Sequence, residues 1–169
     1  MDVSITAVMD YLSWLGSMVE EEVQDRISGY DGRSRLLKAA MSWIENYEQV
    51  ISNAMLNGTG RGEGMPAIRD VELYGLKDPS RVHLRAPTFT FNVRGVHPSR
   101  VAEHLWKKHA IAVLAEDGGG FYSRTLKTYG KSIAIRASPV HFNTLQEVEA
   151  FLCSLAETVS HFRIASGNV

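Results

Sequence analysis

Most of the side chains that could perform chemistry in this 169-residue chain lie between residues 111 and 155. The candidates, in chain order, are Glu116, Asp117, Gly118, Gly119, Gly120, Tyr122, Arg136, Ser138 and His141. His141 can act as a general acid or base near neutral pH, with Glu116 or Asp117 orienting its ring. Tyr122 can donate a proton or a hydrogen bond to a developing oxyanion. The four residues His141, Tyr122, Glu116 and Asp117 are therefore the predicted catalytic groups.

A second set of candidates can hold a ligand. Three consecutive glycines, Gly118, Gly119 and Gly120, allow close approach of a ligand to the backbone and positive φ angles. Ser138 follows a predicted strand at the same end of the chain. His141 also has a structural alternative, because its ring could hydrogen-bond the helix cap at residues 143–144.

The elements that position these residues are two strands and a helix. Residues 111–115 form an apolar run that predicts a buried strand, and residues 132–137 predict another. In the second, Ile133 and Ile135 face one way, whereas Ala134 and Arg136 face the other. Residues 144–147 (TLQE) match a capping box, after which an apolar stripe predicts a helix. The terminal residues 164–169 are expected to fray.

The preceding half predicts further elements. Helices are expected over residues 6–15, ending at Gly16, and over residues 34–57, where apolar residues recur every three or four positions. Strands are expected over residues 68–74 and 87–93, followed by a helix to residue 109 that Ser99 caps. This order predicts an α+β fold, a small mostly antiparallel sheet with helices on one face.

Two stretches carry a family resemblance. They are PTFTFNVRGVHPSRVAEHL and, after a strand and a glycine loop, IAIRASPVHFNTLQEVEAFL. Together they resemble the C-terminal small domain of fold-type-I, class V aminotransferases, and most of all the cysteine desulfurase-like proteins. The segment AVMDYLSWLG resembles the helix that follows the catalytic region of the family's large domain. We therefore expect an N-terminal helical arm over residues 1–32 and an aminotransferase-like small domain over residues 33–169.

The resemblance implies a role for Arg136, and it also implies that the residues that bind the family's cofactor are missing from this chain. In that family, an arginine at the position of Arg136 grips the substrate carboxylate; the alternative is an ion pair with Glu116 or Asp117. The family's pyridoxal phosphate is held by a lysine and by phosphate-binding groups in the large domain. None of the six lysines of this chain occupies that lysine motif. We therefore expect no cofactor, unless a separate large-domain chain is the partner.

Composition limits the remaining classes of function. A formal net charge of -1 argues against general nucleic-acid binding. No apolar run approaches the roughly 20 residues of a membrane helix. The single cysteine, Cys153, fits a reducing compartment, so a cytoplasmic location is expected. His104 and His109 are five apart, on different predicted helix faces, and no metal signature is present, so no metal site is expected.

Three functions remain open from the sequence. The first is a cofactor-independent enzyme of isomerase, cyclase or lyase type, acting by acid–base chemistry on a small carbonyl- or carboxylate-bearing molecule. The second is the small-domain subunit of a split pyridoxal enzyme. The third is a non-catalytic binding remnant. A homodimer is expected, because the N-terminal helix is apolar and the face that a large domain would cover is exposed.

Overall fold

The computed structural model describes residues 3–116 and 123–166. By their internal contacts, the residues form two compact units, Met1–Glu48 and Gln49–Val169. The boundary predicted after residue 32 falls within the first unit. The long helix predicted from residue 34 is present as α2 (Gly32–Asn57) and contributes residues to both units.

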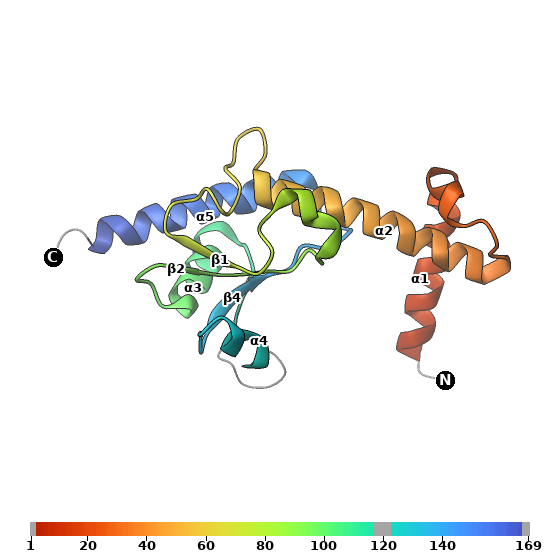
Figure 1. Ribbon diagram of the computed structural model, residues 1–169. Helices are drawn as coiled ribbons and strands as arrows, with labels where there is room; N and C mark the ends of the chain where they lie inside the picture. The colour runs from red at the N-terminus through yellow and green to blue at the C-terminus, as the bar shows by residue number, and fades with distance from the viewer. Residues whose placement is uncertain (1–2, 117–122, 167–169) are drawn as a thin grey trace. The chain divides into compact units, whose positions relative to one another are not determined.

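The first unit contains α1 (Val3–Val19), the 3₁₀ helix η1 (Glu20–Arg26) and the beginning of α2 (Figure 1). The apolar core of α1 and α2 comprises Leu15, Val19, Ala40 and Ile44. The prediction that Gly16 ends the first helix is wrong, because α1 continues to Val19. Gly16 instead lies where the two helices approach most closely, since a Cβ atom at this position would overlap the carbonyl group of Leu36.

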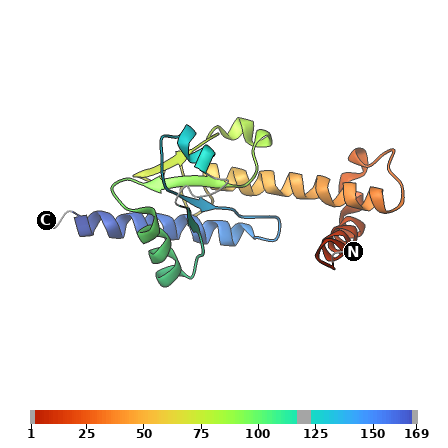
Figure 2. The same cartoon turned by 90° about the horizontal axis from the view of Figure 1, so that it is seen from below.

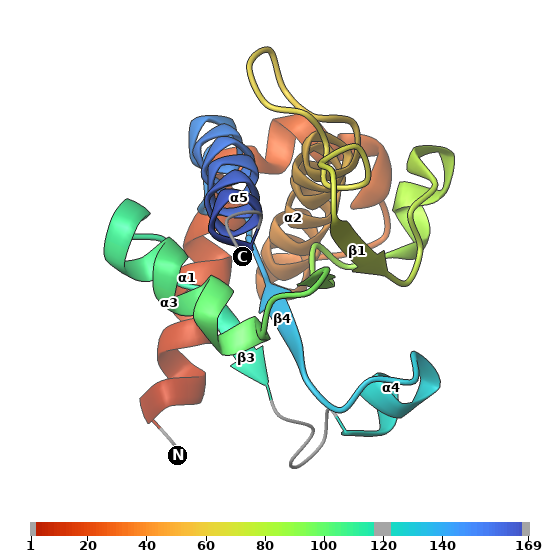
Figure 3. The same ribbon diagram turned by 90° about the vertical axis from the view of Figure 1, so that its left-hand side faces the viewer.

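The second unit is built on a four-stranded sheet, and every pair of neighbouring strands is antiparallel (Figure 3). Its strands are β1 (Val71–Tyr74), β2 (Phe89–Val93), β3 (Leu114–Glu116) and β4 (Ala134–Ala137), in the spatial order β1-β2-β4-β3. The predicted α+β fold is confirmed. The strand predicted over residues 111–115 starts later and is not buried: β3 lies at the sheet edge, and Leu114 is 48% exposed.

Helices α3 (Pro98–His109) and α5 (Leu145–Ser166) pack on the apolar face of the sheet, and α3 crosses α5 (Figure 2). The rings of Phe91 in β2 and Phe151 in α5 meet edge to face, with their centroids 6.4 Å apart. The short helix α4 (Ser123–Thr128) lies on the opposite side of the sheet from α5 (Figures 1 and 3). A 3₁₀ helix, η2 (Pro79–Leu84), joins β1 to β2.

The helix ends test the predicted caps of α3 and α5 and the predicted fraying of the chain end. The capping box is confirmed, because the Thr144 amide donates to Glu147 Oε2 (2.7 Å) and the Glu147 amide donates to Thr144 Oγ1 (3.1 Å). The predicted Ser99 cap is wrong, since the N-cap of α3 is His97, whose ring accepts from the Ser99 amide (3.4 Å). The expected fraying from residue 164 is also wrong up to Ser166, where α5 ends. None of the described helices is both long and apolar enough to cross a membrane.

Candidate functional site on the polar face of the sheet

The two faces of the sheet differ because apolar and polar residues alternate along its strands. In β2, Phe89, Phe91 and Val93 are at most 3% exposed and face the helices. Thr90 and Asn92 point to the other face. The alternation therefore leaves one side of the sheet polar.

A single row of residues crosses all four strands on this polar face. The strand register pairs Tyr74 with Thr90, Thr90 with Arg136, and Arg136 with Leu114. Neighbours in such a row have their Cβ atoms about 5 Å apart. Thr90 is buried and Arg136 is half-buried. The row places the Arg136 guanidinium, a planar donor suited to carboxylates, in the middle of the face.

A charged cluster lies beside this row, centred on Glu72 of β1. Glu72 Oε2 accepts hydrogen bonds from the Tyr74 hydroxyl (3.1 Å) and from Lys131 Nζ (3.3 Å). Glu72 Oε1 lies 3.5 Å from Arg94 Nε. These partners, Lys131 first, hold the pKa of Glu72 below its usual value. Glu72 is therefore ionised, and the charges of Lys131 and Arg94 offset its negative charge.

Tyr74 and Lys131 are also fixed in one protonation state. Burial raises the pKa of the Tyr74 hydroxyl, and hydrogen bonds with Tyr74 and Glu72 raise the pKa of Lys131. Both groups therefore keep their protons at neutral pH. The Tyr129 ring, which follows α4, stacks on Tyr74 with centroids 5.3 Å apart and an interplanar angle of 17°. The stack and the ion pairs hold Tyr74 and Lys131 beside Glu72.

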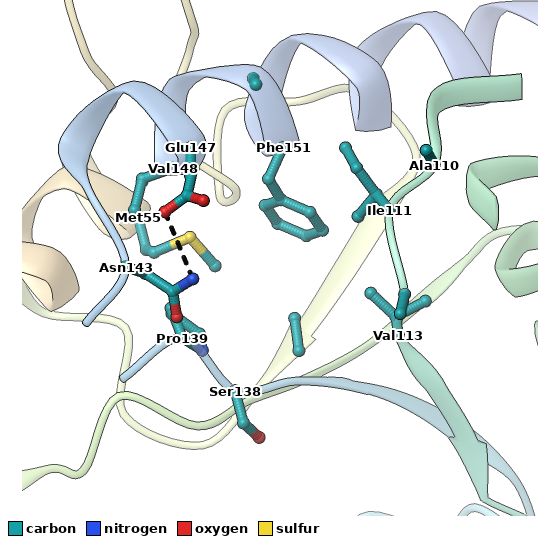
Figure 4. A pocket seen from close by; sticks show the side chains of 13 residues that line it. Met55, Ala110, Ile111, Val113, Ser138, Pro139, Asn143, Glu147, Val148 and Phe151 are labelled. Carbon is teal, nitrogen blue, oxygen red and sulfur yellow. Dashed lines mark hydrogen bonds between the residues drawn. The ribbon is translucent and has the colours of Figure 1, made fainter. Parts of the chain in front are cut away.

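A pocket of about 360 Å³ lies on the other, apolar side of the sheet (Figure 4). Its walls include Met55 and Phe151, and Ser138 stands at the end of β4. Asn143 donates to Glu147 Oε2 (3.4 Å) at one end, as the dashed line in Figure 4 shows. Among the described residues that line the pocket, Glu147 is the single ionisable one. Its carboxylate already accepts a hydrogen bond from the Thr144 amide at the start of α5. The pocket can hold an apolar group but presents no cation to an anion.

The structure separates the residues that the sequence predicted together. Arg136 lies on the polar face, as its alternation with Ile133 and Ile135 indicated, whereas Ser138 lines the pocket and Arg136 does not. His141 lies half-buried in the loop between β4 and α5, with its ring 5.4 Å from that of Phe142. The backbone of Glu116 belongs to β3. Asp117, Gly118, Gly119, Gly120 and Tyr122 lie outside the described residues.

Four residues of the polar face were not predicted as site residues: Glu72, Tyr74, Arg94 and Lys131. Glu72 and Tyr74 alternate with the apolar Val71 and Leu73, so the sequence could have placed them on one side of a strand. No pattern within either strand indicates the strand register that brings Glu72 and Tyr74 beside Arg136. The prediction that His104 and His109 point to different faces of their helix is wrong, because the centroids of their rings lie 5.8 Å apart. No group that could hold a metal ion occurs among the residues that the structure describes.

Comparison with known proteins shows that this chain is similar to part of larger proteins. The family model described as aminotransferase class-V matches residues 35–151. A probable cysteine desulfurase of Synechocystis sp. is 33% identical over 129 residues, which are 75% of this chain and 28% of that protein. The apo structure of a cysteine desulfurase from Thermococcus onnurineus aligns with a TM-score of 0.57 and 27% identity, over 76% of this chain and 31% of that one. The chain thus spans less than a third of the length of these two relatives.

Proposed function

The chain belongs to the aminotransferase class V family, and we propose that it acts as the small-domain subunit of a cysteine desulfurase-like enzyme. In this proposal a separate chain supplies the remainder of the active site. The observation that carries it is the position of Arg136 in the row on the polar face of the sheet, in a chain that spans 28% and 31% of two cysteine desulfurases. The proposed role of the row is to bind the carboxylate of an amino-acid substrate.

Pyridoxal phosphate, the cofactor that this family implies, does not fit the described residues of this chain alone. Its chemistry requires a lysine amine as nucleophile and donors or cations for the phosphate. The raised pKa of Lys131 keeps its amine protonated and bound to Glu72. The pocket offers the Glu147 carboxylate, which would repel a phosphate. In the proposed enzyme, the cofactor and its lysine are contributed by the partner chain.

The charged residues of the polar face and Tyr74 each have a defined part in this proposal. Arg136 forms two parallel hydrogen bonds to the substrate carboxylate and orients it. Lys131 and Arg94 neutralise Glu72, which would otherwise repel that carboxylate. The Tyr74 hydroxyl donates a hydrogen bond to Glu72, which fixes the ring at the edge of the binding face. The chain positions the substrate, and it does not transfer a proton.

Stand-alone acid–base catalysis is the first of the functions that the sequence left open, and it remains a separate hypothesis. It requires a group that exchanges protons near neutral pH beside the bound substrate. Glu72, Tyr74 and Lys131 all have pKa values displaced away from neutrality, which favours the split enzyme. The hypothesis therefore depends on the predicted catalytic groups His141, Tyr122, Glu116 and Asp117. Turnover that survives the replacement of each by alanine would reject it. The proposed cytoplasmic location suits either function.

Co-expression with a large-domain chain of the class V family from the same genome tests the split enzyme. We expect the two chains to purify together, to show the visible absorbance of bound pyridoxal phosphate, and to consume L-cysteine only as a pair. Turnover by this chain alone, or failure of every such large-domain chain to bind it, would reject the proposal.

An arginine variant then tests the role of the polar face within the assembled enzyme. Loss of a charge-assisted hydrogen bond costs about 1.5–3 kcal/mol. Arg136→Ala should therefore raise KM for the amino acid by about 10- to 100-fold. Arg69→Ala is the matched control, because its side chain is 76% exposed and lies outside the row. If KM is unchanged in Arg136→Ala, Arg136 does not bind the substrate carboxylate.

A further inference from the structure

The pocket on the apolar side of the sheet is walled by core residues of the second unit. Met55, Val148 and Phe151 line it, and these residues are only 1%, 2% and 8% exposed. Its volume of about 360 Å³ lies at the lower end of the range for small-molecule sites, which is about 300–1,000 Å³. The pocket can therefore hold a compact ligand without rearrangement of the core.

Two polar side chains of the pocket stand together. Figure 4 shows Glu147 and Asn143 side by side at one end, and Ile111 at the opposite end. Glu147 uses only its Oε2 atom in the helix cap, where it accepts from the Thr144 amide (2.7 Å) and from Asn143 Nδ2 (3.4 Å). Its Oε1 atom accepts no hydrogen bond from any residue that the structure describes. One carboxylate oxygen at this end of the pocket is therefore available to a ligand.

Glu147 keeps its negative charge at neutral pH. The hydrogen bond from the Thr144 amide, and then that from Asn143, hold the pKa of Glu147 below its usual value. The amino end of α5 carries only about half of an elementary positive charge, so the carboxylate leaves this end of the pocket negative. The described lining contains no lysine, arginine or histidine. A complementary ligand therefore has a positive charge at one end and an apolar body.

We propose that this pocket binds a small primary amine, whose ammonium group donates to Oε1 of Glu147 and whose aliphatic or aromatic body lies against Met55 and Phe151. An ammonium group has three donors and no acceptor, which suits a carboxylate oxygen. Charge-assisted hydrogen bonds are stronger than neutral ones, so the site selects an amine over an alcohol of the same shape. Arg136 lies on the other side of the sheet, so this site is separate from the proposed carboxylate site and independent of the proposed function.

Nuclear magnetic resonance titration of the isotope-labelled full chain tests the amine site, with phenethylamine at neutral pH as the probe. We expect the backbone amide signals of Val148 and Phe151 to shift. The dissociation constant should be at least about 10-fold lower than that of phenethyl alcohol, the neutral analogue of the same shape. Hydrocinnamate carries the same ring and a negative charge, so it should not bind.

Glu147→Gln separates the charge of this residue from its role in the helix cap, because glutamine also serves in a capping box. This variant should raise the dissociation constant of phenethylamine by about 10-fold or more and leave that of phenethyl alcohol nearly unchanged. Glu149→Gln is the matched control, since it removes the same charge from α5 at a residue that does not line the pocket. The control should bind phenethylamine like the wild type.

Ala150→Leu is a second variant that narrows the pocket and keeps Glu147, because Ala150 is an exposed residue of the lining. It should weaken the binding of both the amine and the alcohol. Equal affinity for these two probes, or the absence of any shift with phenethylamine, would overturn the proposal. Unchanged amine binding in Glu147→Gln would do the same. If Ala150→Leu binds the amine like the wild type, the amine meets Glu147 at the surface and the pocket is not its site.

Discussion

Replacing Gly16 by alanine should destabilise the first unit, although alanine is the better helix former. In the interior of a helix, alanine is favoured over glycine by about 0.5–1 kcal/mol. At Gly16, however, the new Cβ atom would overlap the backbone carbonyl of Leu36 in α2. A backbone atom cannot rotate away as a side chain can, so the two helices must separate. Overpacking of this kind costs about 1–3 kcal/mol.

The net loss expected for Gly16→Ala is about 1–2 kcal/mol, which lowers Tm by about 2–8 °C in a chain of this size. Urea denaturation in a Trp106→Phe background measures the loss, because the remaining tryptophans, Trp14 and Trp43, both lie in the first unit. Gly60→Ala is the control, since no atom lies within 4 Å of a Cβ there and its φ is outside the left-handed region. Because Gly60 lies in the second unit, its unfolding is followed by Trp106 fluorescence in a Trp14→Phe, Trp43→Phe background. The control should be neutral or up to about 1 kcal/mol more stable. If Gly16→Ala were as stable as Gly60→Ala, the close approach of α1 and α2 would be refuted.

Three further predictions concern the second unit. Thr144→Ala removes the side-chain cap of α5 and should cost about 0.5–2 kcal/mol in urea denaturation. Phe91→Ala removes a fully buried ring that packs on Phe151 and should cost about 3–5 kcal/mol, whereas a cost under 1 kcal/mol would mean a poorly packed core. Burial, and then the charges of neighbouring histidines, lower the pKa of His104, so the unfolded chain binds this proton more tightly and stability should decrease as pH falls below about 6.5. His104→Gln should flatten that decrease, and an unchanged pH profile would contradict the assignment.

The sequence predicted the elements wherever a local signal agreed with the tertiary structure. The three- and four-residue repeat of α2, the alternation of Phe89, Phe91 and Val93, and the Thr144–Glu147 capping box each act within one element. The prediction for Gly16 failed because a distant contact overrode the local signal, whereas the Ser99 cap failed because a competing local cap, His97, begins α3. Gly16 has the features of a helix end, but it serves the packing of α1 against Leu36.

The candidate site follows the same division. Alternation along one strand was enough to place Arg136 away from Ile133 and Ile135, and the family resemblance gave it a role. The position of Arg136 relative to Tyr74 and Glu72 depended on the pairing of strand residues up to 48 positions apart, such as Phe89 with Ala137. The hydrogen bond between Lys131 and Glu72 joins residues 59 positions apart. A shift of one residue in that pairing would move each of these side chains to the opposite face.

By itself, the sequence determined the α+β class, the family and the side of the strand on which Arg136 lies, because these depend on residue type and on spacing within an element. The tertiary structure alone decided that Arg136 stands in a row with Tyr74 and Thr90, while Ser138 lines a pocket on the other side. It also decided that Leu15 and Val19 are covered while Trp14 and Met18 stay exposed on the same helix. The physical reason is that register and helix packing are set by contacts between residues far apart in the chain, which the pattern within one segment does not encode.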